Sequence, residues 1–276
     1  MEGIRRQPLR HGHRILVPAH PSRVAHRRPI PNACDTGNVL DSVFGSPRSW
    51  PRADLIGYTD EFDPRLALAA YCSGVFPMPL DQRMGWWSPM SRAVLPLDAL
   101  RVTRSLRRSA ARHTTTVDRA FDRVLGSCAD PRRPGGWIDE RITAVYTTLH
   151  HMGFAHSVET WDDQGRLVGG LYGILIAGLF AGESMFHHPE LGRDASKVAL
   201  MRLVADLRHA GVTLLDVQWQ TPHLASLGVV EWPREIYLQR LVGALNRDHG
   251  TLWQGEPPRL SGRDLVRRLS PDPPAG

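Results

Sequence analysis

The sequence has almost no lysine, few cysteines and no long hydrophobic run. Lys197 is the only lysine in a chain of 276 residues, so the 34 basic residues are nearly all arginines. Such a bias is typical of genome composition, and arginine counts are therefore weak evidence for nucleic-acid binding. The three cysteines lack C-x-x-C spacing, which gives no support for a thiolate metal site. No apolar run approaches the roughly 18 residues of a transmembrane helix.

The N-terminal residues combine many charges with no apolar core. Residues 1–31 contain seven arginines and one acidic residue, Glu2, which together account for the whole formal net charge of +6. Charges without an apolar segment do not make a secretory signal, so we expect a cytoplasmic protein with no membrane partner. Residues 1–50 are rich in Arg, His, Pro and Ser, and we predict a disordered basic tail, with RNA binding as its functional alternative.

Periodicities divide the rest of the chain into three parts: a small N-terminal domain (51–98), a larger domain (99–250) and a C-terminal tail (251–276). The larger domain contains, in order, a helix over 139–153, three antiparallel strands within 156–186, a helix over 195–211, a strand at 213–219 and a helix over 233–246. We therefore predict an α+β fold, with a GNAT-like acyltransferase C-terminal domain and a small N-terminal α/β domain. Element order is a fold analogy and supplies no function.

Two carboxylates interrupt strands that are predicted to be buried, Glu183 in GESMF and Asp216 in LLDVQW. Burying a carboxylate is costly unless a partner offsets the cost. If the helix over 195–211 crosses back, the two strands lie side by side, and Gln218 projects from the same strand face as Asp216. Glu183 and Met185 likewise share a face of their strand. Such a cluster beside an apolar pocket is suited to holding an amine and orienting its attack. The structural alternative is that each acid pairs with an arginine or caps a backbone group.

Five arginines and no acidic residue lie in the segment RVTRSLRRSAARH, residues 101–113. On a helix, Arg104, Arg108 and Arg112 share one face. The segment is either a solvated basic helix or a contact for nucleic-acid phosphates. Three tryptophans also allow two interpretations, as anchors of a small core or as platforms that stack a base: Trp86, Trp87 and Trp137.

Several cofactor motifs are missing from the sequence. It has no GxGxxG, no GxxxxGK[ST] and no H-E-x-x-H, so we expect neither a metal nor another cofactor. A GNAT enzyme that uses acetyl-CoA needs an R/Q-x-x-G-x-G/A loop before the crossover helix, whose backbone N–H groups hold the pyrophosphate. Residues 187–197, HHPELGRDASK, stand in this place and lack that loop. A CoA-dependent N-acetyltransferase is therefore the less favoured alternative.

A series of segments along residues 53–245 resembles one protein family. The segments are GVFPM, WWSPMSRAVL, GWIDERITAVYTTLHHMGFAHSVETWD, LVGGLYG, LFAGESMFHH, ASKVAL, LLDVQWQTPHLASLG and EWPREIYL. In this order they resemble the leucyl/phenylalanyl-tRNA–protein transferases. The resemblance implies that leucine or phenylalanine, and in some members methionine, is moved from aminoacyl-tRNA to the N-terminal arginine or lysine of acceptor proteins. This transfer marks the acceptors for N-degron degradation.

The resemblance also implies that the chain needs no CoA and no metal, and it assigns roles to individual residues. Asp216 would draw a proton from the acceptor amine, Gln218 would orient that amine, and Glu183 would hold the cationic N-terminal side chain or support this network. Trp137 would lie near the terminal adenosine. Four arginines would face the tRNA acceptor stem: Arg104, Arg107, Arg108 and Arg112. The apolar pocket for the donor side chain would be lined by Leu171, Phe180, Met185, Leu200, Leu203 and Leu215. We also expect a monomer.

The sequence departs from the family pattern in the N-terminal domain. FPM, with Met78, stands where the family often has FPW, and WWSPMSR stands where it has WWSPDPR. The usual glycine-glycine-aspartate stretch is replaced by GYTDEF. Because Met78 removes an aromatic ring from the adenosine site, a non-catalytic tRNA-binding relative is the second alternative.

Overall fold

The computed structural model describes residues 43–133, 135–247, 252–253 and 255–270. Its first part contains a 3₁₀-helix (Pro47–Ser49), β1 (Leu55–Thr59), α1 (Pro64–Cys72), β2 (Phe76–Leu80), β3 (Arg83–Trp87), β4 (Ser91–Val94) and α2 (Arg104–Ala110). The middle contains β5 (Thr114–Val117), α3 (Phe121–Cys128), α4 (Glu140–His151), β6 (Ala155–Trp161), β7 (Leu167–Ile176) and β8 (Leu179–His187). The last part contains α5 (Ala195–His209), β9 (Leu214–Gln218), α6 (Pro222–Ser226), β10 (Val230–Pro233), α7 (Arg234–Leu245), β11 (Leu260–Ser261) and α8 (Gly262–Leu269).

The small N-terminal domain is a three-stranded antiparallel sheet, in the order β1-β3-β2, covered by α1. Asp63 caps the N-terminus of α1, and its carboxylate accepts hydrogen bonds from two backbone N–H groups of the first turn. Pro64 follows at the first helical position, which suits its fixed φ. Trp86 is completely buried, and its indole N–H donates to Thr59 Oγ1 at 3.0 Å. Trp86 is therefore a core anchor, and its alternative as a stacking platform is wrong.

Ordered structure begins earlier than the sequence indicates. We predicted a disordered tail over residues 1–50, but Phe44 and Trp50 are buried in the main core, and Phe44 packs edge-on against Trp86 with ring centroids 5.1 Å apart. The prediction is wrong for residues 43–50, because two aromatic side chains contribute more apolar burial than the polar composition around them suggests. Residues 1–42 lie outside the described residues.

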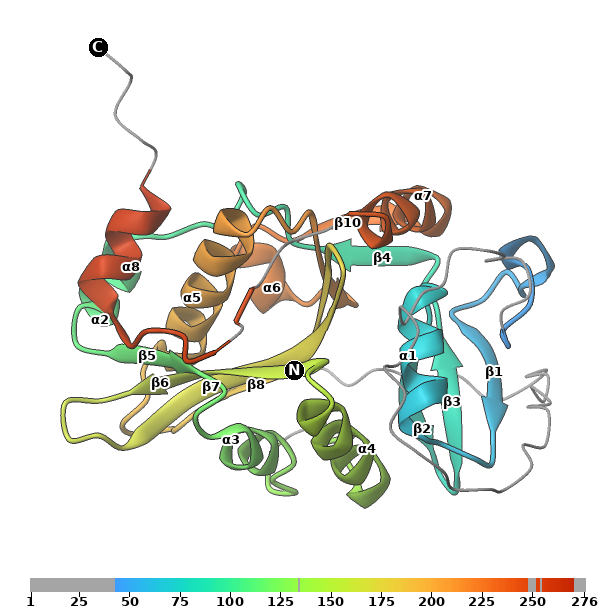
Figure 1. Cartoon of the computed structure of the whole chain (residues 1–276), viewed down its shortest axis with the longest axis horizontal. Coiled ribbons are helices and arrows are strands. Elements are labelled where there is room, and N and C mark those ends of the chain that lie inside the picture. The colour runs from blue at the N-terminus through green and yellow to red at the C-terminus, as the bar shows by residue number, and fades with distance from the viewer. Residues whose placement is uncertain (1–42, 134, 248–251, 254, 271–276) are drawn as a thin grey trace, which may run out of the picture.

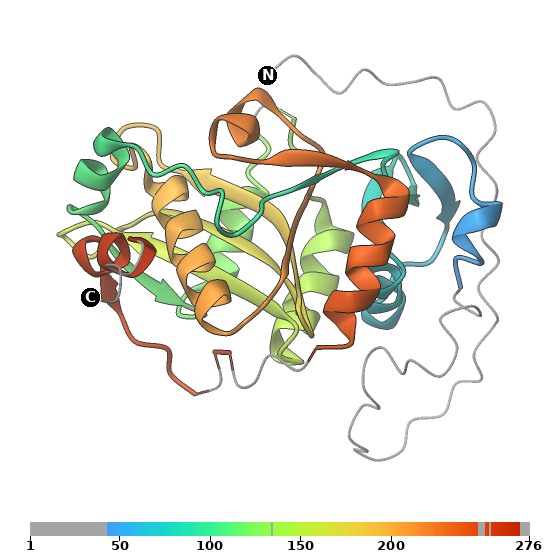
Figure 2. The same ribbon diagram turned by 90° about the horizontal axis from the view of Figure 1, so that it is seen from above.

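The larger domain is built on an eight-stranded sheet in the order β10-β4-β9-β8-β7-β6-β5-β11. Neighbouring strands are antiparallel except β8 and β9, which are parallel because α5 crosses between them. Helices α3 and α4 cover one face, while α2, α5 and α8 lie on the other (Figure 1). Figure 2 shows α5 along the sheet, with α2 and α8 toward one end and α7 toward the other. The predicted element order and the α+β class are confirmed.

Two predicted boundaries are wrong. Strand β4, residues 91–94, pairs with β9 and β10 in the large sheet, so the small domain ends before it and not at residue 98. The C-terminal segment is part of the fold, since β11 pairs with β5 and Leu265 of α8 is fully buried against α2 and α5. Strands β4 and β11 are too short for a clear period-2 pattern, which explains why the sequence did not reveal them. Among the described residues, no helix has the length and apolar character needed to cross a bilayer.

Candidate functional site

The polar site lies where β8 and β9 separate. Their parallel pairing runs from Leu179–Leu214 to Ala181–Asp216. A register shift between Tyr172 and Gly173 places a β-bulge in β8 at Glu183. A bulge turns the side chains of its strand away from simple alternation. We expected Glu183 and Met185 to share a strand face, but Glu183 contacts the tyrosine side of the sheet while Met185 packs in the cluster on the α5 side.

Asp216 is fully buried and accepts four hydrogen bonds. The Arg92 guanidinium donates from Nε to Oδ1 at 2.8 Å and from Nη2 to Oδ2 at 2.6 Å. The Tyr237 hydroxyl donates to Oδ2 at 2.9 Å, and the backbone N–H of Gln218 donates to Oδ1 at 3.0 Å. A carboxylate has about four lone-pair sites, so Asp216 has no free acceptor. Its geometry is that of a structural ion pair, the alternative that the sequence left open, and does not fit the expected role of a proton-accepting base.

Glu183 is partly buried, and its carboxylate has fewer partners than that of Asp216. Tyr146 donates its hydroxyl hydrogen to Oε2 at 3.0 Å, and the side-chain amide of Gln218 donates to Oε1 at 3.2 Å. Burial among apolar and aromatic groups raises the pKa of Glu183 to about 8, although hydrogen bonds from Tyr71 and Tyr146 oppose this rise. A carboxylate with a pKa near neutrality is suited to exchange a proton with a substrate.

Gln218 joins the two acidic residues across the separated strands. Its backbone N–H binds Asp216 and its side-chain amide binds Glu183. The residue has φ of 60°, in the left-handed region that non-glycine residues seldom adopt. Such a conformation costs about 1–3 kcal/mol, is found often at active sites, and here re-aims the side chain at the end of β9. The structure therefore brings together the three polar residues that the sequence predicted.

The small domain contributes directly to this site. The Tyr71 hydroxyl of α1 is hydrogen-bonded to the Tyr146 hydroxyl of α4, and burial raises the pKa of both phenols. Arg92 Nη1 donates to the carbonyl oxygen of Gly74 at 3.3 Å. Sequence reasoning missed Arg92, Tyr71, Tyr146 and Tyr237. The position of Arg92 in WWSPMSRAVL, in the strand that follows the small domain, was the one signal that could have indicated it.

The six predicted pocket residues lie together. Five are buried in the hydrophobic cluster between the sheet and α5, and partly buried Met185 packs against the same cluster. Two of the buried residues come from α5, whose helical spacing turns both leucines inward. The cluster borders the opening between β8 and β9 from the face opposite the tyrosines. The six residues are Leu171, Phe180, Met185, Leu200, Leu203 and Leu215.

The predicted RNA-contacting residues lie on the surface or partly so. Trp137 is half-buried just before α4, and Met78 is half-buried in β2. Trp87 is half-buried and packs edge-on against Trp219 with centroids 5.5 Å apart. The arginines of α2 and of the turn after it are exposed and make no ion pair with the described carboxylates: Arg104, Arg107, Arg108 and Arg112. Within the described part of the chain, no group of three His, Cys, Asp or Glu side chains is placed to hold a metal ion.

Comparison with known proteins agrees with the resemblance found in the sequence. A family model described as leucyl/phenylalanyl-tRNA protein transferase matches residues 94–242, and a model of that family's N-terminal domain matches residues 60–90. The two models meet where the chain passes from β3 to β4. A leucyl/phenylalanyl-tRNA–protein transferase of Salinibacter ruber is 48% identical over 191 residues, which cover 68% of this chain and 82% of the relative. One from Novosphingobium aromaticivorans is 50% identical over 186 residues, covering 64% and 69%.

Among solved structures, FemX overlaps with 52% of this chain and 60% of its own, with a TM-score of 0.42 and 12% identity. The sequence relatives are far closer, and the first family model runs from the last residue of β4 into α7. The polar residues of the large domain that lie where β8 and β9 separate all fall within the matched range, except Arg92. This chain belongs to the leucyl/phenylalanyl-tRNA–protein transferase family.

Proposed function

We propose that the chain transfers leucine or phenylalanine from aminoacyl-tRNA to the N-terminal arginine or lysine of acceptor proteins, which marks them for N-degron degradation. Curated relatives that are 48% and 50% identical to this chain over the aligned 191 and 186 residues carry the name of this activity. The observation that carries the proposal is the carboxylate of Glu183, held by Tyr146 and Gln218 at the edge of a buried apolar cluster. No cofactor, a monomeric state and a cytoplasmic location complete the proposal.

The reaction moves one acyl group and one proton. The acceptor amine attacks the carbonyl carbon of the ester that links the amino acid to the terminal ribose. A carbon–nitrogen bond forms, the ester carbon–oxygen bond breaks, and the ribose oxygen leaves. The amine nitrogen loses a proton and the ribose oxygen gains one, so a single group that accepts and returns a proton balances the step. Because the tRNA ester is already activated, positioning supplies much of the acceleration.

Glu183 is the group that we assign to this proton. Its pKa of about 8 lies close to that of an α-amino group, which makes proton transfer between them nearly balanced in free energy. Gln218 orients the amine, since its amide already contacts Glu183. Asp216 acts as a positioning residue: it holds the backbone N–H of Gln218 and neutralises Arg92. In its ionised form, Glu183 also attracts a cationic acceptor terminus.

The buried cluster selects the donor side chain. Its five buried members and Met185 are all apolar, so leucine and phenylalanine lose little on entering, whereas a polar side chain loses hydrogen bonds to water. Trp137 contacts the terminal adenosine, and the exposed arginines in and after α2 contact the acceptor stem through phosphates. These assignments predict that donor choice depends on the cluster and that RNA affinity depends on the basic surface.

One assay separates the three candidate activities. The chain is incubated with a peptide that begins with arginine and with either labelled Phe-tRNA or labelled acetyl-CoA. Label that moves from Phe-tRNA supports the proposal, and a peptide beginning with acetylated arginine serves as the matched control that blocks the amine. Transfer from acetyl-CoA alone would identify an N-acetyltransferase. Tight tRNA binding without transfer would identify the non-catalytic relative.

A further inference from the structure

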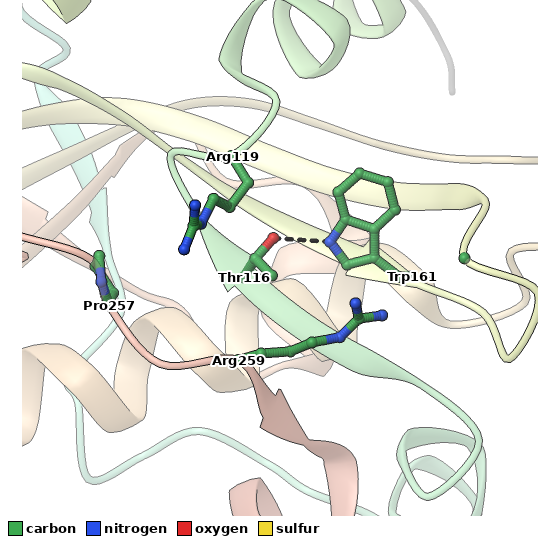
Figure 3. A pocket seen from close by; sticks show the side chains of 6 residues that line it. Thr116, Arg119, Trp161, Pro257 and Arg259 are labelled. Atoms are coloured by element: carbon green, nitrogen blue, oxygen red, sulfur yellow. Dashed lines mark hydrogen bonds between the residues drawn. The ribbon is translucent and has the colours of Figure 1, made fainter.

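A cavity of about 320 Å³ lies near the β5–β11 edge of the large sheet, away from the site described above. Figure 3 shows Arg119 and Arg259 on either side of the Thr116–Trp161 pair. The lining comes from β5 and the loop after it, from the end of β6 with its turn, and from the chain that leads into β11. The lining residues are Thr116, Arg119, Trp161, Gly165, Pro257 and Arg259.

The floor of the cavity is held by a buried hydrogen-bond network. The indole N–H of Trp161 donates to Thr116 Oγ1 at 2.7 Å. Thr116 in turn donates to the carboxylate of Glu159, which is completely buried and also accepts from Ser157. Because the Thr116 hydroxyl both accepts and donates, its orientation is fixed, and the Trp161 ring is fixed with it.

One arginine lies against this ring, and two others line the cavity. Arg123 lies 5.4 Å from the ring centroid. Arg259 donates to Thr114 Oγ1 and has no ion pair with a described carboxylate. Arg119 pairs with Glu256, but the two side chains are 47% and 79% exposed. An exposed pair of this kind contributes little to stability, so a stronger anion can displace Glu256 from Arg119.

We propose that this cavity binds the sugar–phosphate backbone of the donor tRNA, with Arg119 and Arg259 on phosphate oxygens and Trp161 beneath a ribose or base. The fork of a guanidinium matches the oxygens of a phosphate, and an aromatic face stacks on any base. Two arginines that flank a fixed tryptophan offer both contacts at once. The inference rests on the proposed transfer from tRNA, and it assigns a second contact to that substrate.

The position of the cavity suits an RNA that already reaches the catalytic site. Trp161 of β6 pairs with Leu167 at the beginning of β7. Glu183 of β8 lies on the other side of β7, next to Tyr172 and Gly173, which are about five residues further along that strand. Strand geometry makes this separation about 20 Å. The cavity therefore contacts RNA beyond the reacting 3′ end, at the same end of the molecule as α2 and its arginines (Figure 1).

The first test measures binding of deacylated tRNA to the full chain by fluorescence anisotropy, over a series of salt concentrations. The double variant Arg119→Ala/Arg259→Ala should raise Kd about tenfold. It should also reduce the salt slope, which is the slope of log Kd against log salt concentration, by about one for each phosphate that is no longer bound. Glu256→Gln should lower Kd, because it removes the anion that competes for Arg119. The matched control is Arg83→Ala, an exposed arginine in an ion pair on the small domain, which should change neither value.

The second test measures kinetics with two donors. With Phe-tRNA the double variant should raise KM and keep kcat within about twofold, since the cavity does not touch the reacting atoms. With phenylalanyl-adenosine, which lacks the RNA body, KM should not change. If the wild-type chain transfers from neither donor, the proposed function fails while the binding test still decides about the cavity.

The inference is overturned if the double variant matches Arg83→Ala in Kd and salt slope. It is also overturned if Glu256→Gln leaves Kd unchanged, or if the double variant impairs both donors equally, because the arginines would then act through the catalytic site. Thermal melting of each variant verifies folding. Should the double variant unfold, the opposite sign expected for Glu256→Gln keeps the inference testable.

Discussion

The ion pair between Arg92 and Asp216 is buried to 1% exposure on both sides. Each partner keeps the other from being an isolated charge in the core, and Tyr237 and the Gln218 N–H complete the shell. Pairs of this kind add little net stability, but removing one member leaves an uncompensated buried charge.

We therefore predict that Asp216→Ala lowers the free energy of unfolding by about 3–5 kcal/mol, in addition to reducing transfer. The double variant Arg92→Met/Asp216→Leu should recover much of this stability, because it replaces both charges by apolar groups. Urea unfolding of wild type and both variants measures the effect. An Asp216→Ala protein with wild-type stability would contradict the structural role of the pair.

Glu183 should make stability depend on pH. Its pKa is about 8 in the folded protein and near 4.5 in the unfolded chain, so the folded state holds the proton more tightly. The stability that the bound proton of Glu183 contributes to the folded protein is full below about pH 4.5 and is lost as the pH rises through 8. We predict that Glu183→Gln, which cannot ionise, gains stability relative to wild type between about pH 5.5 and pH 8.5. Urea unfolding at both values measures this gain, with the exposed Glu190→Gln as control. A pH-independent difference would refute the raised pKa.

For individual residues, the sequence predicted three polar members of the site but could not predict their hydrogen-bond partners. Glu183, Asp216 and Gln218 stand out because a charge or amide interrupts an apolar strand. Arg92 and Tyr146 do not stand out, since an arginine beside a strand and a tyrosine on a helix have ordinary alternatives. Their contact with the acids depends on packing between segments that are distant in sequence.

Among the elements, the bulge in β8 decides where Glu183 points. Gly173 in β7 pairs with Gly182 across this bulge. A Cβ atom at Gly173 would lie 2.3 Å from the carbonyl oxygen of Ala181 and 2.5 Å from the Phe180 ring, whereas one at Gly182 would have its nearest neighbour at 3.6 Å. The two glycines face each other but differ in the space around them.

We predict that Gly173→Ala destabilises the fold by about 1–3 kcal/mol, the usual effect of overpacking, and reduces transfer by displacing β8. Gly182→Ala is the matched control and should cost less, since its contact is an ordinary one. Thermal unfolding and initial rates with Phe-tRNA measure both effects. Equal losses in the two variants would show that the close approach at Gly173 does not matter.

Helices and strands with clear periods were predicted from the sequence within a few residues, as for α4, α5 and the β6–β7 hairpin. The bulge was not predicted, because it depends on the register between β7 and β8 and leaves no periodic trace. The expected common face of Glu183 and Met185 failed for this reason. Strand β11 was missed because its two residues are too few for a pattern.

The whole molecule depends on segments near both ends of the described chain. Phe44 and Trp50 enter the main core, and the Trp50 indole N–H donates to the Phe44 carbonyl at 2.7 Å. Near the other end, Arg202 of α5 donates to the Pro258 carbonyl at 3.0 Å, and α8 closes a small cluster against α2. The composition of these segments indicated tails, but a few buried side chains were enough to order them.

We predict that deletion of residues 1–50 leaves a protein less stable than deletion of residues 1–42, by about 3 kcal/mol or more, because the longer deletion removes two buried aromatic side chains. Differential scanning calorimetry of the two truncated chains measures the difference. The double variant Phe44→Ala/Trp50→Ala in the full chain is the control and should reproduce it. Equal stability of the two truncations would mean that the packing of Phe44 and Trp50 is dispensable.

The carbonyl of Gly74 and the hydroxyl of Tyr71 reach across from the small domain to Arg92 and Tyr146. The contact between Tyr71 and Tyr146 thus joins the two stretches that separate family models match, at the centre that we propose for the reaction. We therefore expect that neither stretch works when it is transferred alone. A chimera that combined the part of one relative corresponding to residues 43–90 with the remainder of another would need residues that can form both of these contacts. The two stretches have to be inherited together, and substitutions at their junction should be accepted in pairs during evolution.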